Sequence, residues 1–331
     1  MKLNSGKLFS YYINAHKPFP QCRSDSKNLL QGSGAIAHTD TLQFLNSLDL
    51  KLQYNNHSIL QEFTSTCYKW LNNGSIKMIG LENYDVDYSN GTTQSFDSFY
   101  FRHHNRRFRC LVGEYFYHLK SWICGNINWQ WITSDQPLQH GDALVLSIPF
   151  CDTGNMFDYN ELLEQCNQLN IPVLLDCCYI SLTQNTTIDC NYNCIDTICY
   201  SLSKTFPVAH YRIGIRFTKP QIFDGQKLHH SINYNNILGA AIGNEFIKKF
   251  PVDYIHKKYY DKQQIACEFF NLEPSDSILF ATGDESWSHY SRQTLLDAYK
   301  LKFDPTMFAN RICLRAVYEN WNKFLEFKNE Y

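Results

Sequence analysis

A lysine can act as an amine nucleophile only if it loses its proton near working pH, and a fixed positive charge nearby favours that loss. Lys204 ends the segment Ser201-Leu202-Ser203-Lys204, and Arg212 follows eight residues later. The guanidinium of Arg212 favours the neutral amine, and together with the serine hydroxyls it suits a phosphate group. The segment therefore predicts an imine-forming lysine beside a phosphate site.

A carboxylate follows a strongly apolar run earlier in the chain. Asp176 comes directly after Ile-Pro-Val-Leu-Leu at 171–175, and Tyr179 lies three residues further on. Open α/β sheets bind ligands at the carboxyl ends of their strands, and a carboxylate buried there needs a cationic partner. In a bound cofactor that contains a pyridine ring, the protonated ring nitrogen would be such a partner. Tyr179 could then donate a hydrogen bond to a phenolic oxygen on that ring.

A phosphate cradle is predicted at the start of a helix. Gly91, Thr92 and Thr93 precede Phe96 and Phe99, whose spacing fits one helical face. Backbone N–H groups, hydroxyls and the positive end of the helix dipole all favour an anion there. Taken alone, this motif is also a common helix cap, so its weight comes from its combination with the lysine and the carboxylate.

Two other kinds of chemistry fit the sequence less well. Ser-x-x-Lys also occurs in penicillin-recognising acyl enzymes, with Ser201 as the nucleophile, but their Ser-Asp-Asn and Lys-Thr-Gly segments are missing. Cys177-Cys178 and Cys190-x3-Cys194 lack a second Cys or His pair at the spacing of a zinc site. No metal is expected.

The elements that must position these residues are short apolar runs that alternate with helical or polar stretches. This pattern is typical of an α/β domain with a largely parallel sheet. We expect a helix over 158–169 with a capping box from Asp158 to Glu161, and further helices over 237–250 and 316–327. The expected strands are 108–112, 143–149, 171–177, 195–200 and 211–218.

Composition limits the range of partners and environments. The 331 residues carry a formal net charge of −2, which gives no reason to expect nucleic acid or an anionic membrane as partner. The sequence shows neither a secretory signal nor an apolar run of membrane-spanning length, so a cytoplasmic protein is expected. The 13 scattered cysteines suit reduced, mostly buried thiols.

In three blocks the sequence resembles fold-type I enzymes that use pyridoxal 5'-phosphate (PLP), in particular class I/II aminotransferases. The blocks are NGTTQSF, IPVLLDCCY and SLSKTFPVAHYRIG, and the resemblance runs from about residue 90 to 214. It implies a largely parallel central sheet flanked by helices, with a reduced small domain. The expected division is an N-terminal segment of the small domain at 1–60, a PLP-binding large domain at 61–250 and a C-terminal small domain at 251–331.

The resemblance assigns roles to residues within the three blocks and between them. Lys204 would form the imine with PLP, Asp176 would pair with the pyridine nitrogen, and Tyr115 would stack on the ring. The full set implied to bind the cofactor is Gly91, Thr92, Thr93, Tyr115, Cys151, Asp176, Tyr179, Ser201, Ser203 and Arg212. Tyr115 is one of 22 tyrosines and is equally compatible with an ordinary core position.

Two features depart from the family pattern, one at position 151 and one in the length of the C-terminal part. Where such enzymes carry Asn-Pro-Thr-Gly, this chain has Cys151-Asp152-Thr153-Gly154, so a weakly donating thiol replaces the asparagine amide. Asp152 or a water molecule is the alternative donor to the phenolic oxygen. The C-terminal part is short, and for the substrate carboxylate the best candidate is Arg311, with Arg315 as the alternative.

The reaction implied is transfer of an amino group between an amino acid and a 2-oxo acid by a homodimer. A PLP-dependent lyase, decarboxylase or oxidase acting on an amino acid is the alternative, because all of these reactions share the same carbanion chemistry. A non-catalytic protein of the same fold is a third hypothesis. The combined presence of Lys204, Asp176 and Arg212 argues against it.

Overall fold

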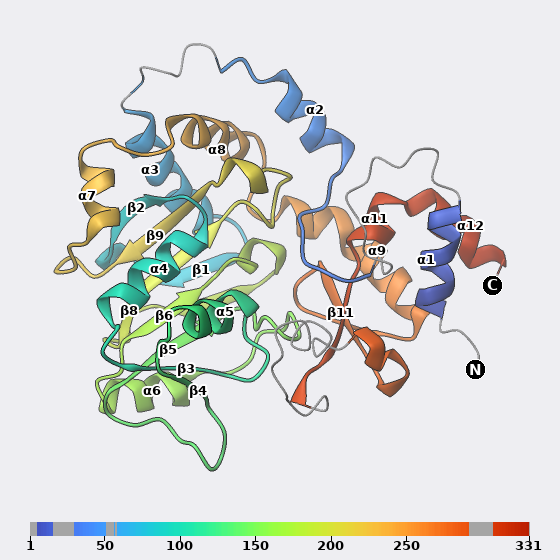
Figure 1. The fold of residues 1–331 in the computed structure, drawn as a ribbon. Coiled ribbons are helices and arrows are strands. Elements are labelled where there is room, and N and C mark those ends of the chain that lie inside the picture. The colour runs from blue at the N-terminus through green and yellow to red at the C-terminus, as the bar shows by residue number, and fades with distance from the viewer. Residues whose placement is uncertain (1–4, 16–29, 51–55, 57, 291–306, 331) are drawn as a thin grey trace.

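The computed structural model describes residues 5–15, 30–50, 56, 58–290 and 307–330. Helices surround a seven-stranded sheet in one part of the molecule, and a smaller part contains a three-stranded sheet and both ends of the described chain (Figure 1). No helix among the described residues is long and apolar enough to cross a membrane.

The seven-stranded sheet has the order β2-β9-β8-β6-β5-β3-β4. β9 is antiparallel to both of its neighbours, and the other strands are parallel to one another. The largely parallel sheet expected from the sequence is therefore confirmed. Its strands are β2 (Asp85–Ser89), β3 (Arg107–Cys110), β4 (Trp129–Trp131), β5 (Asp142–Ser147), β6 (Val173–Asp176), β8 (Ile195–Ser201) and β9 (Gly214–Thr218).

Alternate side chains of the buried strands pack on opposite faces of this sheet. In β5, Ala143 and Val145 pack with residues of α4 and α5, whereas Leu144 and Leu146 join the core formed with α3, α6 and α8. Both faces are thus covered, as in other parallel sheets (Figure 1). These helices are α3 (Ile59–Leu71), α4 (Thr92–Arg102), α5 (Phe116–Cys124), α6 (Asn160–Gln168) and α8 (Ile237–Lys249).

The smaller part brings the two ends of the described chain together. Phe9 makes aromatic contacts with Phe324 and Phe327, so the first helix packs on the last. The elements of this smaller part are α1 (Ser5–Ala15), α9 (Tyr254–Phe270), β10 (Glu273–Pro274), β11 (Phe280–Gly283), β12 (Asn310–Cys313), α11 (Arg315–Glu319) and α12 (Trp321–Glu330). The remaining elements are α2 (Thr39–Ser47), α7 (Gly225–Ser231), the parallel pair β1 (Ile76–Ile79) and β7 (Thr186–Asp189), and the 3-10 turns Leu81–Asn83, Ile180–Leu182, Ala209–Tyr211 and Glu285–Tyr290.

Two expected elements differ in their bounds from those of the structure, and one expected helix cap is absent from it. The strand expected over 211–218 begins at Gly214, because the chain first forms a 3-10 turn and a left-handed residue at Arg212, φ 54°. The helix expected over 316–327 is two helices, which end and begin on either side of Asn320. The capping box from Asp158 does not form, because α6 begins at Asn160 and Asp158 accepts only the Asn160 N–H.

The described cysteines are all free thiols, and all of them except Cys124 are buried. Burial in apolar surroundings raises the pKa of the Cys166 thiol to about 12. The expectation of mostly buried cysteines is therefore confirmed for the described part of the chain.

Candidate active site

A cavity of about 140 Å³ lies where β6 and β8 end. Asp176 is the last residue of β6, and Lys204 follows shortly after the end of β8. The parallel strands therefore bring both residues to the same edge of the sheet. The cavity is lined by Gly34, Thr92, Thr93, Tyr115, Cys151, Asp176, Cys178, Tyr179, Ser203, Lys204, Ala209 and Arg212.

One end of the cavity is suited to an anion. Gly91 precedes α4 with φ +76°, and a Cβ added to it would overlap the guanidinium of Arg212. That guanidinium donates from Nη2 to Thr93 Oγ1 at 3.0 Å. A helix N-terminus, two threonine hydroxyls and a guanidinium therefore face the same space, which is the donor set that a phosphate requires.

Lys204 lines the same cavity. Its Nζ donates to Ser33 Oγ at 3.1 Å and lies 5.7 Å from the ring centroid of Tyr179. Burial raises the pKa of Tyr179, so its hydroxyl stays protonated and available as a donor. The amine and the phenol thus both face the cavity.

Asp176 is a buried carboxyl group with few hydrogen bonds of its own. It is 5% exposed, and its Oδ1 accepts the N–H of Cys178 at 3.1 Å. Burial, and then the charge of Glu114, raise its pKa to about 7, while the Cys178 N–H and Lys204 oppose this rise. A cationic ring nitrogen placed beside Asp176 would stabilise its ionised form, so this position fits the pyridine nitrogen of PLP.

Tyr115 and Cys151 line the remaining walls. Tyr115 is the residue before α5, and burial raises the pKa of its phenol to about 12. Cys151 is 2% exposed and follows β5, where its N–H donates to Ser147 Oγ at 2.8 Å. Cys151, at the position where the resemblance implies an asparagine, therefore forms part of the cavity wall.

Arg311 reaches the cavity edge from the small sheet. It lies on β12, its Nη1 donates to the Cys151 carbonyl and is 3.8 Å from Cys151 Sγ, and its guanidinium stacks 4.2 Å from the centroid of the Phe280 ring. Arg315 lies against Gly34, which lines the cavity, and 3.7 Å from Glu319, with 39% of its side chain exposed. Only Arg311 contacts a residue that sequence analysis placed in the site.

Two of the predicted cofactor residues do not line the cavity. Gly91 lies behind the Arg212 guanidinium. Ser201 is 1% exposed, and its hydroxyl bonds to the Ile213 carbonyl and lies 2.9 Å from Ser203 Oγ. Ser201 therefore fixes the turn that leads to Lys204, and Ser203 is the serine that faces the cavity.

Several residues of the site were not predicted from the sequence. Gly34, Cys178 and Ala209 line the cavity, and Ser33 contacts the amine of Lys204. Gly32-Ser33-Gly34 indicates a turn, but nothing near it in the sequence shows that it meets Lys204, 171 positions away. Cys178 follows Asp176 so closely that its place could have been inferred.

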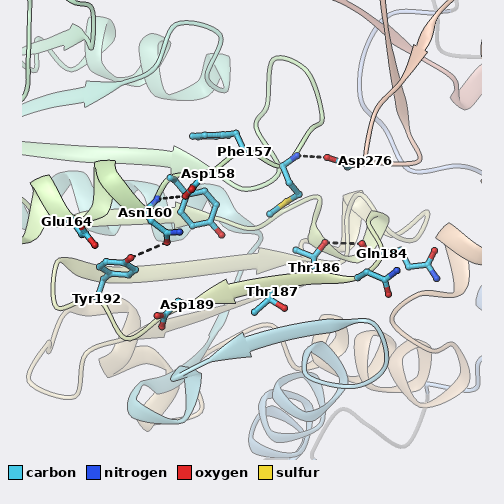
Figure 2. Close-up of a pocket in the computed structure, with 13 residues that line it drawn as sticks. Phe157, Asp158, Asn160, Glu164, Gln184, Thr186, Thr187, Asp189, Tyr192 and Asp276 are labelled. Carbon is cyan, nitrogen blue, oxygen red and sulfur yellow. Dashed lines mark hydrogen bonds between the residues drawn. The ribbon is translucent and has the colours of Figure 1, made fainter.

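A larger groove of about 760 Å³ lies elsewhere, beside β7 and the segment 156–160 (Figure 2). Its acidic side chains, Asp158, Glu164, Asp189 and Asp276, are exposed, and Tyr192 donates to Asn160 within it. None of the residues predicted to do chemistry lines this groove. The smaller cavity is therefore the candidate active site despite its size.

No family model matches the sequence, and no curated protein matches it. Solved structures do match its fold. The aromatic aminotransferase from Pyrococcus horikoshii is similar over 90% of this chain and 94% of its own, with a TM-score of 0.65 and 14% identity. The histidinol-phosphate aminotransferase from Clostridium acetobutylicum is similar over 91% and 99%, with a TM-score of 0.58 and 13% identity.

A third structure carries a different activity on the same fold. The PLP-bound C-S lyase from Staphylococcus hominis is similar over 90% of this chain and 89% of its own, with a TM-score of 0.60 and 10% identity. The chain therefore has the fold of the fold-type I PLP-dependent enzymes, and the fold class expected from the sequence is confirmed. These neighbours include both aminotransferases and a lyase, so the fold alone does not select the reaction.

Proposed function

We propose that the protein is a PLP-dependent enzyme that transfers an amino group between an amino acid and a 2-oxo acid. The observation that carries this proposal is the meeting of Lys204, Asp176 and Arg212 in one cavity at the carboxyl edge of the sheet. A lysine amine, a buried carboxyl and a guanidinium at a helix N-terminus match the aldehyde, ring nitrogen and phosphate of PLP.

Different residues of the cavity would bind the phosphate and the ring of the cofactor. Thr92, Thr93, Ser203 and Arg212 would bind the phosphate, and Gly91 leaves the space in which Arg212 lies. Tyr115 would pack on the ring. Ser201 is the weakest of the predicted ligands, since its hydroxyl is engaged with the Ile213 carbonyl.

The ring edge and the reacting atoms would lie between four side chains. Asp176 would pair with the ring nitrogen, and Tyr179 would donate to the phenolic oxygen, with Cys151 beside it. Lys204 would hold the aldehyde carbon through Nζ and, once released, would move a proton from the substrate α-carbon. When bound, PLP supplies a ring that withdraws electrons from that carbon.

For the substrate carboxylate, Arg311 is the better of the two arginines. Its guanidinium lies beside Cys151 and over Phe280, whose ring packs edge-on against Tyr179 at 5.2 Å. Because a guanidinium has five N–H donors, bonding to the Cys151 carbonyl leaves others for a carboxylate. Small-molecule amino acids and 2-oxo acids are the proposed partners.

The proposed domains are those expected from the sequence, at 1–60, 61–250 and 251–331, and the proposed assembly is a homodimer. Exposed apolar side chains support a partner subunit near the phosphate end, because Ile232, Tyr234 and Leu238 are 59%, 77% and 50% exposed. They flank Asn236, whose side chain donates to the carbonyl of Tyr211, the residue before Arg212.

The test of the cofactor is the visible spectrum of the purified protein with added PLP, compared with that of a Lys204→Ala variant. The wild type should gain an absorption band that borohydride removes while fixing one PLP to the peptide containing Lys204. Absence of that band in the wild type, or the same borohydride product in the variant, would overturn the assignment.

The test of the reaction is a half-reaction. An aminotransferase converts bound PLP stoichiometrically to its amine form with an amino acid, and an added 2-oxo acid restores the aldehyde. A lyase, decarboxylase or oxidase acting on an amino acid is the second candidate, supported by the lyase among the similar folds. Turnover to product without the amine form would favour it, and no spectral change with a broad panel would favour a non-catalytic protein.

A further inference from the structure

A second buried carboxylate lies next to the one expected to meet the cofactor ring. Glu114, in the loop between β3 and α5, is 3% exposed, and Asp176 is 5% exposed. Carboxylates are rarely buried unless they are paired with cations or hydrogen-bond donors, because burial strongly disfavours the charged form. Two of them at one strand end therefore call for a chemical explanation.

Hydrogen bonds fix Glu114 beside Asp176. Its Oε1 accepts the N–H of Ser147 at 2.8 Å, and its Oε2 accepts the N–H of Tyr115 at 3.2 Å. Ser147 ends β5 and is the direct register partner of Asp176 at the end of β6, where neighbouring strands lie about 5 Å apart. The same carboxylate thus contacts the strand end next to Asp176 and the aromatic residue expected to stack on the ring.

Charged side chains of both signs act on Asp176. Lys204 is the cation that acts on Asp176, and Glu114 is the anion. The thiols of Cys177, Cys178 and Cys199 lie near enough for the charge of Asp176 to act on them, and burial raises the pKa of each of them, so they stay neutral. Burial, and then the charge of Glu114, raise the pKa of Asp176 to about 7, so near neutral pH Asp176 holds its proton in a large fraction of the molecules.

We propose that Glu114 is a positioning residue that keeps a proton on Asp176 in the free protein, ready for the cofactor's ring nitrogen. This inference rests on the proposed function, because it requires Asp176 to meet that nitrogen. On binding, the O–H bond of Asp176 breaks and an N–H bond forms on the ring. Asp176 and Glu114 then both carry a negative charge beside the ring cation, so the protein need not take this proton from solution.

The consequence is a defined pH dependence of PLP binding. Without the charge of Glu114, Asp176 would lose its proton at lower pH, and the ring cation would lose one of its two supporting anions. Both changes weaken binding as the pH rises. We expect the pH at which affinity falls to shift down by about one unit in a Glu114→Gln variant, which corresponds to about tenfold weaker binding at pH 8.

Glu114→Gln is a suitable variant because its amide oxygen can still accept the N–H of Ser147, so the charge is lost and this hydrogen bond is kept. The matched control is Asp97→Asn. It removes one negative charge from a carboxyl that bonds to Tyr117 at 2.9 Å on the outer side of α4 and α5. PLP affinity of the apo protein would be titrated from pH 6 to 9, and calorimetry in buffers of different ionisation enthalpy would count the protons taken up.

The inference requires that Glu114→Gln shift the pH profile and take up more protons than the wild type, while Asp97→Asn matches the wild type. Equal weakening at every pH would show that Glu114 acts through its hydrogen bonds and would overturn the inference, as would an unchanged profile. In both cases the wild type still binds PLP, so the proposed function stands. If the wild type itself fails to bind PLP, it is the proposed function that fails.

Discussion

The guanidinium of Arg212 occupies the space where any side chain at Gly91 would lie. Gly91 also has φ +76°, a conformation that L-residues rarely adopt. Gly91→Ala should therefore displace Arg212 from Thr93, and we expect roughly tenfold or weaker PLP binding together with a loss of about 1–2 kcal/mol of unfolding free energy. PLP titration and urea unfolding measure the two effects.

Gly141 is the matched control for this substitution. It has φ +95°, but nothing lies within 4 Å of a Cβ added to it. Gly141→Ala should cost similar stability from backbone strain and leave PLP affinity unchanged. If both variants bind PLP equally well, Arg212 does not need the space above Gly91.

We expect substitutions of Arg311 and Arg315 to affect substrate binding to different extents. Arg311→Gln should weaken the response to amino acids by about 10- to 100-fold, since a charge-assisted hydrogen bond contributes about 1.5–3 kcal/mol. Arg315→Gln should have a much smaller effect, because its guanidinium is already paired with Glu319, 3.7 Å away. Spectral titration with an amino acid, and with the matching amine that lacks a carboxylate, separates carboxylate recognition from a general defect. The opposite order of effects would assign the carboxylate to Arg315.

The part of the site that lies on strand ends was predictable from the sequence. Asp176 follows an uninterrupted apolar run, and Lys204 follows another strand, so parallel topology alone brings them to one edge. Gly91 before a helix indicated the anion site for the same local reason. In each case the motif and the element that positions it lie within a few residues of each other.

What the sequence does not reveal depends on contacts between distant segments. Ser33 meets Lys204, and Glu114 meets Ser147, only because the fold brings separate loops to the same place. The start of β9 was wrong for a related reason. Arg212 adopts a left-handed conformation while its guanidinium lies over Gly91, and this tertiary contact overrides the extended pattern of the local sequence.

We expect a substitution at Cys151 to change the pH midpoint of the visible spectrum of the PLP complex. An asparagine amide donates a stronger hydrogen bond than a thiol, and a donor to the phenolic oxygen stabilises its ionised form. Cys151→Asn should therefore lower the pH midpoint of the visible spectrum of the PLP complex by about one unit. Cys151→Ala removes the thiol without adding a donor and should leave the midpoint nearly unchanged. A midpoint that moves equally in both variants would mean that residue 151 does not contact the phenolic oxygen.

We expect the ion pairs of Asp142 to make the free energy of unfolding depend on pH. It is buried with Arg109, whose Nη1 lies 2.7 Å from Asp142 Oδ2, and Arg107 lies 2.7 Å from Oδ1. Burial opposes ionisation, but hydrogen bonds from Arg107, Gln139 and Arg109 outweigh it and lower the pKa of Asp142. The stabilisation is therefore complete above the unfolded pKa of about 4 and is lost as the pH falls below it.

Asp142→Asn leaves the buried Arg109 charge without its carboxylate, so we expect a loss of about 3–5 kcal/mol at pH 7 and a smaller difference from the wild type at pH 3. The exposed pair of Asp40 and Lys258 is the control, because Asp40→Asn should cost less than about 1 kcal/mol. Urea unfolding at both pH values measures these differences, and an equal loss at pH 3 and pH 7 would contradict the assignment to charge.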